Sequence, residues 1–229
     1  MNEVPTEMTT RKGHALKIDI TQLSAAQQYK LITSTVVPRP IALVTTFHED
    51  TGHNAAPYSF FNAMGEDPPI FVLGLEDRPG SSEVKDTTWN IRETGEFVIN
   101  LVDQDLGPAM NTCAIAFPKG VSEISEAGLH LLASEKVKPH RIDESPVSFE
   151  CQTVDLIRIA PRRFLAIGRA VFMHVRDGLF DSEKGYISPD RYKPLGRYFG
   201  KFYVKDHALF EMEVPSVESW NQNKKSRGD

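Results

Sequence analysis

Apolar and polar residues are arranged along this chain in short stretches that predict mostly β structure. The apolar start of residues 41–47 predicts a buried strand, and the polar turn over 48–53 predicts that the chain returns as a second strand over 54–62. Further strands are expected at 70–75, 96–102, 147–159, 163–176 and 209–214, the last of which could close the sheet. Hairpin-like spacings dominate and helices are not interleaved regularly, so the pattern predicts a mainly β, antiparallel barrel with peripheral helices.

Helix signals are few but specific. Ser24 and Gln27 form a capping-box pattern that starts a short helix, and the pattern predicts a second helix over 82–94 with Gly95 as its C-terminal stop. Residues 107–132 are expected to be mostly helix and loop. The polar ends, 1–15 and 221–229, are expected to be disordered, which leaves one domain over 16–220.

Composition supports an ordinary globular protein. The chain has 229 residues, of which 40% are hydrophobic and 25% are charged, with a formal net charge of −5. This charge and the absence of a Lys/Arg cluster argue against a nucleic-acid partner. No apolar run is long enough to span a bilayer, and the polar N-terminus lacks a secretion signal. Cys113 and Cys151 are isolated and predict buried thiols in a reducing compartment, so we expect a cytoplasmic protein.

Familiar catalytic and metal motifs are missing from the sequence. There is no G-x-G-x-x-G, no G-x-x-x-x-G-K-[ST] and no G-x-S-x-G, so a Rossmann site, a P-loop and a hydrolase elbow are not indicated. The histidines are scattered without metal-ligand spacing, so we expect no metal site. His53 is the one to watch because it lies beside the most informative segment.

That segment is Asn54–Asn62, which combines small residues, amides and aromatics. Small side chains let the backbone approach a flat ring, while Ser59 and Asn62 can offer polar groups to its edge. The alternative is structural, since Phe60 or Phe61 can simply face the core.

Two further features are consistent with a phosphate. Thr87 and Thr88 lie near the start of the second predicted helix with Lys85 just before them, at a point where unpaired N–H groups favour an anion. The alternative is that Asp86 or Thr87 only caps this helix. Thr45 and Thr46 add hydroxyls at the end of the first strand, although threonine is also common in strands for structural reasons.

A loop near the C-terminus, residues 194–203, brings together two glycines, two tyrosines, Arg197 and Lys201. Glycines allow close approach to a ligand, and an arginine can meet a phosphate or carboxylate. An ordinary surface loop with snorkelling basic side chains is the alternative.

Taken together, PRPIALVTT, G-x-N-x-APYSFFN, PP, KDTxxNI and EFVIN resemble the flavin reductase-like family with its FMN-binding split β-barrel. The resemblance runs from about Leu31 to Tyr203, and PLGRYFGKFY is similar to the family's C-terminal element. Phe199 departs from that element, because a second glycine is frequent at its position.

The resemblance implies a homodimer with FMN near the subunit interface. It implies that Ser59, Phe60 and Asn62 lie along the ring and ribityl chain, with Thr45 and Thr46 close by. It also gives roles to the remaining candidate site residues: Lys85 and Thr87 would hold the phosphate, and Arg197 and Tyr203 would border the flavin or the nicotinamide.

The function expected from this resemblance is a flavin reductase that transfers a hydride from NADH or NADPH to FMN, and that could supply reduced flavin to a partner monooxygenase. One alternative is a non-catalytic flavin-binding electron carrier or flavin store. Another is a related oxidase acting on a small phosphorylated or aromatic substrate, in which His53 or Tyr203 would handle a proton. The sequence does not distinguish NADH from NADPH, FMN from FAD, or bound from shuttling flavin.

Overall fold

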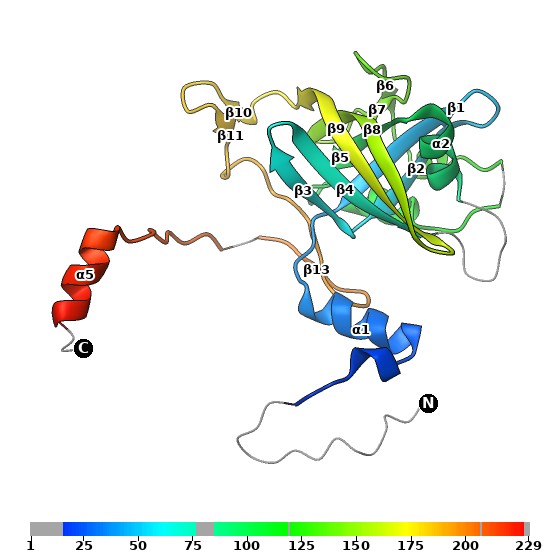
Figure 1. Cartoon of the computed structure of the whole chain (residues 1–229). Helices are drawn as coiled ribbons and strands as arrows, with labels where there is room; N and C mark the ends of the chain where they lie inside the picture. Colours follow the sequence, from blue (N-terminus) through cyan, green and yellow to red (C-terminus); the bar gives the residue numbers. More distant parts are fainter. Residues whose placement is uncertain (1–15, 77–84, 119, 207, 227–229) are drawn as a thin grey trace.

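A computed structural model describes residues 16–76, 85–118, 120–206 and 208–226 of the chain, and its centre is a curved, seven-stranded antiparallel sheet (Figure 1). The strands are β1 (Ala42–His48), β2 (Gly52–Tyr58), β3 (Phe61–Glu66), β4 (Pro69–Glu76), β5 (Glu96–Leu101), β8 (Val147–Ala160) and β9 (Arg163–Val175). Their order across the sheet is β2-β1-β5-β8-β9-β4-β3. The predicted mainly β, split-barrel fold with peripheral helices is confirmed.

The strand predicted over 54–62 is wrong in one respect, because the chain breaks at Ser59 and Phe60. β2 pairs with β1, whereas β3 pairs with β4. The carbonyl of Phe60 accepts a hydrogen bond from the Gly74 amide of β4 at 2.7 Å, so the chain changes partner at this point. The segment Ser59–Phe60 therefore joins two strands that lie at opposite edges of the sheet.

The helices from α1 to α4 lie around the barrel. They are α1 (Ala25–Thr35), α2 (Asp86–Thr94), α3 (Gly107–Thr112) and α4 (Glu123–Glu126), with a 3-10 turn, η1, at Ile20–Gln22. The capping box of Ser24 and Gln27 is confirmed at the start of α1. Gly95 ends α2 with a φ of 68°, as expected for a left-handed C-terminal stop. The predicted start of that helix at residue 82 lies outside the described residues.

Two apolar clusters stabilise the two sides of β1. The first fills the barrel interior and includes Phe97, Leu73 and Leu75. The second packs between β1, β2, α3, α4 and the short strand β7 (Arg141–Ile142), which pairs with β6 (Leu131–Leu132). Burial on both sides explains the unbroken apolar start of β1. Cys113 and Cys151 are buried free thiols, as the sequence predicts.

The C-terminal part of the chain forms two short hairpins. The first pairs β10 (Phe180–Asp181) with β11 (Tyr186–Ile187), and the second pairs β12 (Gly196–Arg197) with β13 (Tyr203–Val204). The strand predicted over 209–214 is wrong, because this segment pairs with nothing in the sheet and Phe210 is 78% exposed. Figure 1 shows it leading away from the barrel to helix α5 (Val217–Ser226). This helix takes in residues 221–226, which the sequence analysis places in a disordered tail, and Ser216 accepts a hydrogen bond from the Ser219 amide in its first turn.

Across the described ranges, no helix combines the length and the apolar character needed to cross a membrane.

Candidate functional site

Lys85 and Thr87, which the sequence predicts for a phosphate, lie at the N-terminus of α2. Lys85 occupies the N-cap position without a side-chain cap hydrogen bond, so neither Asp86 nor Thr87 caps the helix in the way the structural alternative required. The buried Thr87 hydroxyl accepts a hydrogen bond from Nδ2 of Asn54 on β2 at 2.9 Å, and no acceptor for its own proton is found among the described residues. The first N–H groups of α2 and the Thr87 hydroxyl therefore lie at the same helix end, with Lys85 at its N-cap.

Two buried groups fix α2 against the barrel. Nδ2 of Asn90 donates to the hydroxyl of Thr46 on β1 at 2.9 Å, and both residues are fully buried. In the first turn of α2, the buried hydroxyl of Thr88 has no hydrogen-bond partner among the described residues. A buried polar atom without a partner is costly in a protein interior, so Thr88 is a further candidate for contact with a ligand.

Thr45 points to the other side of β1. Its hydroxyl donates to the carbonyl of His140 at 2.7 Å and accepts from Nδ2 of Asn100 at 3.2 Å. Thr45 and Thr46 are therefore both engaged inside the protein, and the structure places neither of them on a surface.

The Ser59–Asn62 segment lies at the other end of β2 from Asn54. Phe60 is 38% exposed and packs edge-on against Tyr29 of α1, with the ring centroids 6.5 Å apart. Asn62 is exposed on β3, whereas Phe61 faces the core. The structural alternative thus applies to Phe61 and not to Phe60. Gly74 permits this arrangement, because a Cβ there would lie 2.9 Å from the Cβ of Phe60.

Arg39 is a residue that the sequence analysis did not single out. Only 5% of it is exposed, and its guanidinium donates to the carbonyls of Thr33, Val36 and Tyr198. Its Nε also donates to Oγ of Ser59 at 3.4 Å. The sequence signal was limited to an arginine between two prolines, which says nothing about burial.

Arg197 and Tyr203 lie together on the β12–β13 hairpin. The guanidinium carbon of Arg197 is 4.5 Å from the centre of the Tyr203 ring, and its Nη2 donates to the carbonyl of Gly200 at 2.6 Å. The backbone of Arg197 pairs with that of Arg39, which brings this hairpin to the Ser59 side of the barrel.

His53 does not join that hairpin. It lies near the start of β2, with its ring 4.7 Å from that of Phe47 and 4.3 Å from that of His140. Burial, with a smaller effect of His140, lowers the pKa of His53 to about 4, so its imidazole is neutral at neutral pH. The structure therefore separates His53 from Arg197 and Tyr203.

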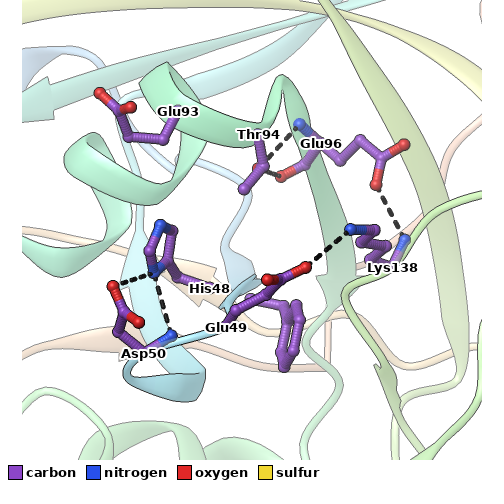
Figure 2. Close-up of a pocket in the computed structure, with 8 residues that line it drawn as sticks. His48, Glu49, Asp50, Glu93, Thr94, Glu96 and Lys138 are labelled. Atoms are coloured by element: carbon purple, nitrogen blue, oxygen red, sulfur yellow. Dashed lines mark hydrogen bonds and ion pairs between the residues drawn. The ribbon is translucent and has the colours of Figure 1, made fainter.

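A pocket of about 430 Å³ opens beside the β1–β2 hairpin and the C-terminal end of α2 (Figure 2). Its lining includes the carboxylates of Glu49, Asp50, Glu93 and Glu96 and a single lysine, Lys138. Lys138 lies 3.3 Å from Glu49, so the excess charge is negative. This pocket disfavours a phosphate and does not coincide with the sites predicted from the sequence.

β2 connects the two regions that the sequence predicts for a phosphate and a flat ring. Its residues Asn54 and Tyr58 are about 13 Å apart along an extended strand. The start of α2, where the phosphate is predicted, therefore lies at one end of the strand, and an exposed aromatic and amide segment lies at the other. Such a pair of regions can hold an elongated ligand with an aromatic ring and a phosphate.

Comparison with known proteins gives consistent matches. A family model for the flavin reductase like domain matches residues 34–204. The chain is 38% identical over 200 residues to protein YwrF of Bacillus subtilis, covering 85% of this chain and 97% of that protein.

Two solved structures are similar in both sequence and fold. The 2-nitrobenzoate 2-nitroreductase NbaA of Pseudomonas fluorescens is 37% identical with a TM-score of 0.80, and the match covers 88% of this chain and 97% of NbaA. Nitrilotriacetate monooxygenase component B of Bacillus cereus is 33% identical with a TM-score of 0.82, and the match covers 87% of this chain and 99% of that protein.

Proposed function

The chain belongs to the flavin reductase-like family, and from this premise we propose that it binds FMN and transfers a hydride to it from NADH or NADPH. The observation that carries the proposal is the pair of regions at the two ends of β2. The buried, unpartnered Thr88 hydroxyl supports the fit of a phosphate at the start of α2.

The residues divide into three groups under this proposal. Lys85, Thr87 and the first N–H groups of α2 would hold the phosphate, because charge, hydroxyl proton and helix dipole all favour an anion. Ser59, Phe60 and Asn62 would contact the ring and ribityl chain. Thr45 and Thr46 would act indirectly, since their hydroxyls already hold the strand against His140 and α2.

When bound, FMN would supply the hydride-accepting chemistry, and the protein would supply position and electrostatics. Arg197 and Tyr203 would border the nicotinamide side, where an arginine can attract the anionic dinucleotide. No protein acid or base is required for direct hydride transfer. His53 is neutral, half-buried and away from this hairpin, which is consistent with a hydride transfer that uses no protein acid or base.

The proposed active form is a homodimer in the cytoplasm. Val72 of β4 pairs with Ile167 of β9, and Leu165 of β9 pairs with Ile157 of β8. These four residues alternate with buried core residues, so they form an apolar stripe on the outer face of the sheet. Asn62 pairs with Val72, so this stripe borders the ring segment. A second copy covering the stripe would also enclose the flavin.

The reduced flavin would serve a second reaction. The likeness to nitrilotriacetate monooxygenase component B supports delivery to a partner monooxygenase. The likeness to a 2-nitrobenzoate 2-nitroreductase favours a second candidate, in which a nitroaromatic accepts the electrons on the protein itself. Product analysis with 2-nitrobenzoate, in the presence of FMN and NADH, separates the two.

The decisive experiment is an absorbance spectrum of the purified protein with FMN, recorded before and after anaerobic addition of NADH or NADPH. We expect protein-bound flavin that is bleached faster than free FMN under the same conditions. Bound flavin that neither nucleotide reduces would favour the electron carrier or flavin store instead. Absence of flavin binding would reject both.

A further inference from the structure

Arg39 connects three parts of the chain that are distant in sequence. Its Nη1 donates to the carbonyls of Thr33 at 2.9 Å and Val36 at 2.8 Å, at the end of α1. Its Nη2 donates to the carbonyl of Tyr198 at 3.1 Å, in the β12–β13 hairpin. Its Nε also donates to Oγ of Ser59, so the planar guanidinium of Arg39 donates four hydrogen bonds in all.

The backbone of Arg39 repeats the same connection. Its N–H donates to the carbonyl of Arg197 at 3.0 Å, and the N–H of Arg197 donates back to the carbonyl of Arg39 at 2.8 Å. The hairpin that carries Arg197 and Tyr203 is therefore attached to Arg39 by main chain and side chain together.

The charge of Arg39 is not neutralised in the usual way. Among the described residues, no carboxylate forms an ion pair with its guanidinium, and its hydrogen bonds end on neutral carbonyls and one hydroxyl. The guanidinium carbon also lies 5.8 Å from the centre of the Phe60 ring. Burying a cation without a counter-charge is expensive, so a smaller apolar side chain would serve better if packing alone were required.

We propose that Arg39 is a positioning residue that locks the β12–β13 hairpin to the Ser59–Phe60 junction before any cofactor binds. The two flanks of the site, the ring segment and the nicotinamide border, then form one preorganised unit. The assignment of these flanks rests on the proposed function, whereas the mechanical link between them rests only on the contacts of Arg39. Preorganisation lowers the entropy lost when a ligand binds.

The test compares hydrogen exchange of the hairpin amides in the flavin-free protein, because this readout does not depend on activity. Arg39→Met keeps the length of the side chain and removes the fork. Arg191→Met is the matched control, since Arg191 also donates to a backbone carbonyl, that of Gly178 at 2.6 Å, in a loop away from this hairpin.

We expect the amides of Arg197, Tyr198 and Phe202 to exchange roughly tenfold or more faster in R39M, because a hydrogen bond to a charged group is worth at least a factor of that size. In R191M they should exchange as in the unchanged protein. Unchanged exchange of the hairpin in a folded R39M protein would overturn the proposal. If R39M does not fold, the same exchange measurement is made on Arg39→Lys, which keeps the charge and loses the planar fork. Unchanged exchange of the hairpin amides in folded R39K would then overturn the proposal.

FMN affinity distinguishes this inference from the proposed function. If the unchanged protein binds FMN, R39M should bind it roughly tenfold or more weakly while R191M does not. Unchanged FMN affinity in R39M would show that the hairpin does not contribute to the flavin site and would overturn that part of the inference. If the unchanged protein binds no FMN, the proposed function fails, and the exchange experiment still decides the link made by Arg39.

Discussion

The carboxylate of Glu150 on β8 lies 2.6 Å from Nε2 of His174 on the neighbouring strand β9, and Glu150 is completely buried. The same carboxylate accepts hydrogen bonds from the N–H groups of Glu135 at 2.7 Å and Lys136 at 2.6 Å. It therefore ties the loop before β7 to the sheet. Burial acts to raise the pKa of Glu150, but the hydrogen bonds from Glu135, His174 and Lys136 together outweigh it and hold this pKa below 4.5.

The first prediction concerns this carboxylate. Glu150→Gln should lower the free energy of unfolding by about 2 kcal/mol or more at pH 7, since glutamine keeps one acceptor oxygen and turns an amide NH2 towards one of the buried donors in place of the other. Because the folded pKa is depressed, the stabilisation is complete above pH 4.5 and is lost as the pH falls through the lower folded value. Urea denaturation over this range checks both effects. Glu144→Gln is the control, because its 2.6 Å contact with His130 is exposed and should contribute less than about 1 kcal/mol.

A second pH effect is expected from His53. Its folded pKa of about 4 lies below its ordinary value of 6.5, so the unfolded chain binds more protons between these values. Stability should therefore fall as the pH drops from 6.5 towards 4, and His53→Gln should flatten this part of the curve. Denaturation curves at three pH values in this window measure the slope. An equally steep slope in H53Q would assign the effect to other groups.

For the phosphate end of the site, Lys85→Met should weaken FMN binding by roughly tenfold to a hundredfold, as expected for loss of a charge-assisted contact. Riboflavin, which has no phosphate, should bind both proteins equally well. Fluorescence titration with the two ligands provides the measurement. Lys184→Met, on the distant β10–β11 hairpin, is the control; an equal loss for riboflavin in K85M would contradict the assignment.

At the ring end, Gly74→Ala would place a Cβ 2.9 Å from that of Phe60 and push the Ser59–Phe60 segment away from β4. We expect a loss of about 1–3 kcal/mol in stability, together with weaker FMN binding. Gly65→Ala on β3 is the matched control, because its nearest neighbour, the carbonyl oxygen of Pro68, would be 3.4 Å away. Equal behaviour of the two variants in urea denaturation and flavin titration would show that the contact with Phe60 is not limiting.

The apolar stripe on the outer sheet face predicts the effect of a charge on assembly. Ile167→Glu should convert the proposed dimer to a monomer, because an unpaired carboxylate would be buried in the interface. Light scattering coupled to gel filtration measures the mass. Ile115→Glu, at a position already 53% exposed outside the sheet, should leave the mass unchanged. A monomeric unchanged protein would remove the basis of this prediction.

Much of the fold could be predicted from local patterns, because those patterns report local physics. The capping box at Ser24 and the glycine stop at Gly95 are both confirmed, since each is set by a few neighbouring residues. The break at Ser59 and Phe60 could not be predicted, because it depends on a hydrogen bond to Gly74 on another strand. Apolar and polar residues alternate along segment 209–214 as in a strand, but the segment pairs with no strand of the sheet.

The candidate site shows the same division. The residue types at Ser59–Asn62 and at the start of α2 predict a ring and an anion there, and both stay predictions. Only the structure shows that Thr45 and Thr46 are buried, because burial depends on what packs over a strand. Arg39 was missed for the same reason: its partners, Ser59 and Tyr198, are far from it in sequence.

The extended strand between Asn54 and Tyr58 acts as a fixed spacer, since a paired β-strand neither stretches nor shortens. Under the proposed function, this spacing would select ligands by the length of the linker that joins their ring to their anionic group. Flavin analogues with a shortened or lengthened side chain would then engage one end of β2 at the expense of the other, and their affinity would fall on both sides of the natural length.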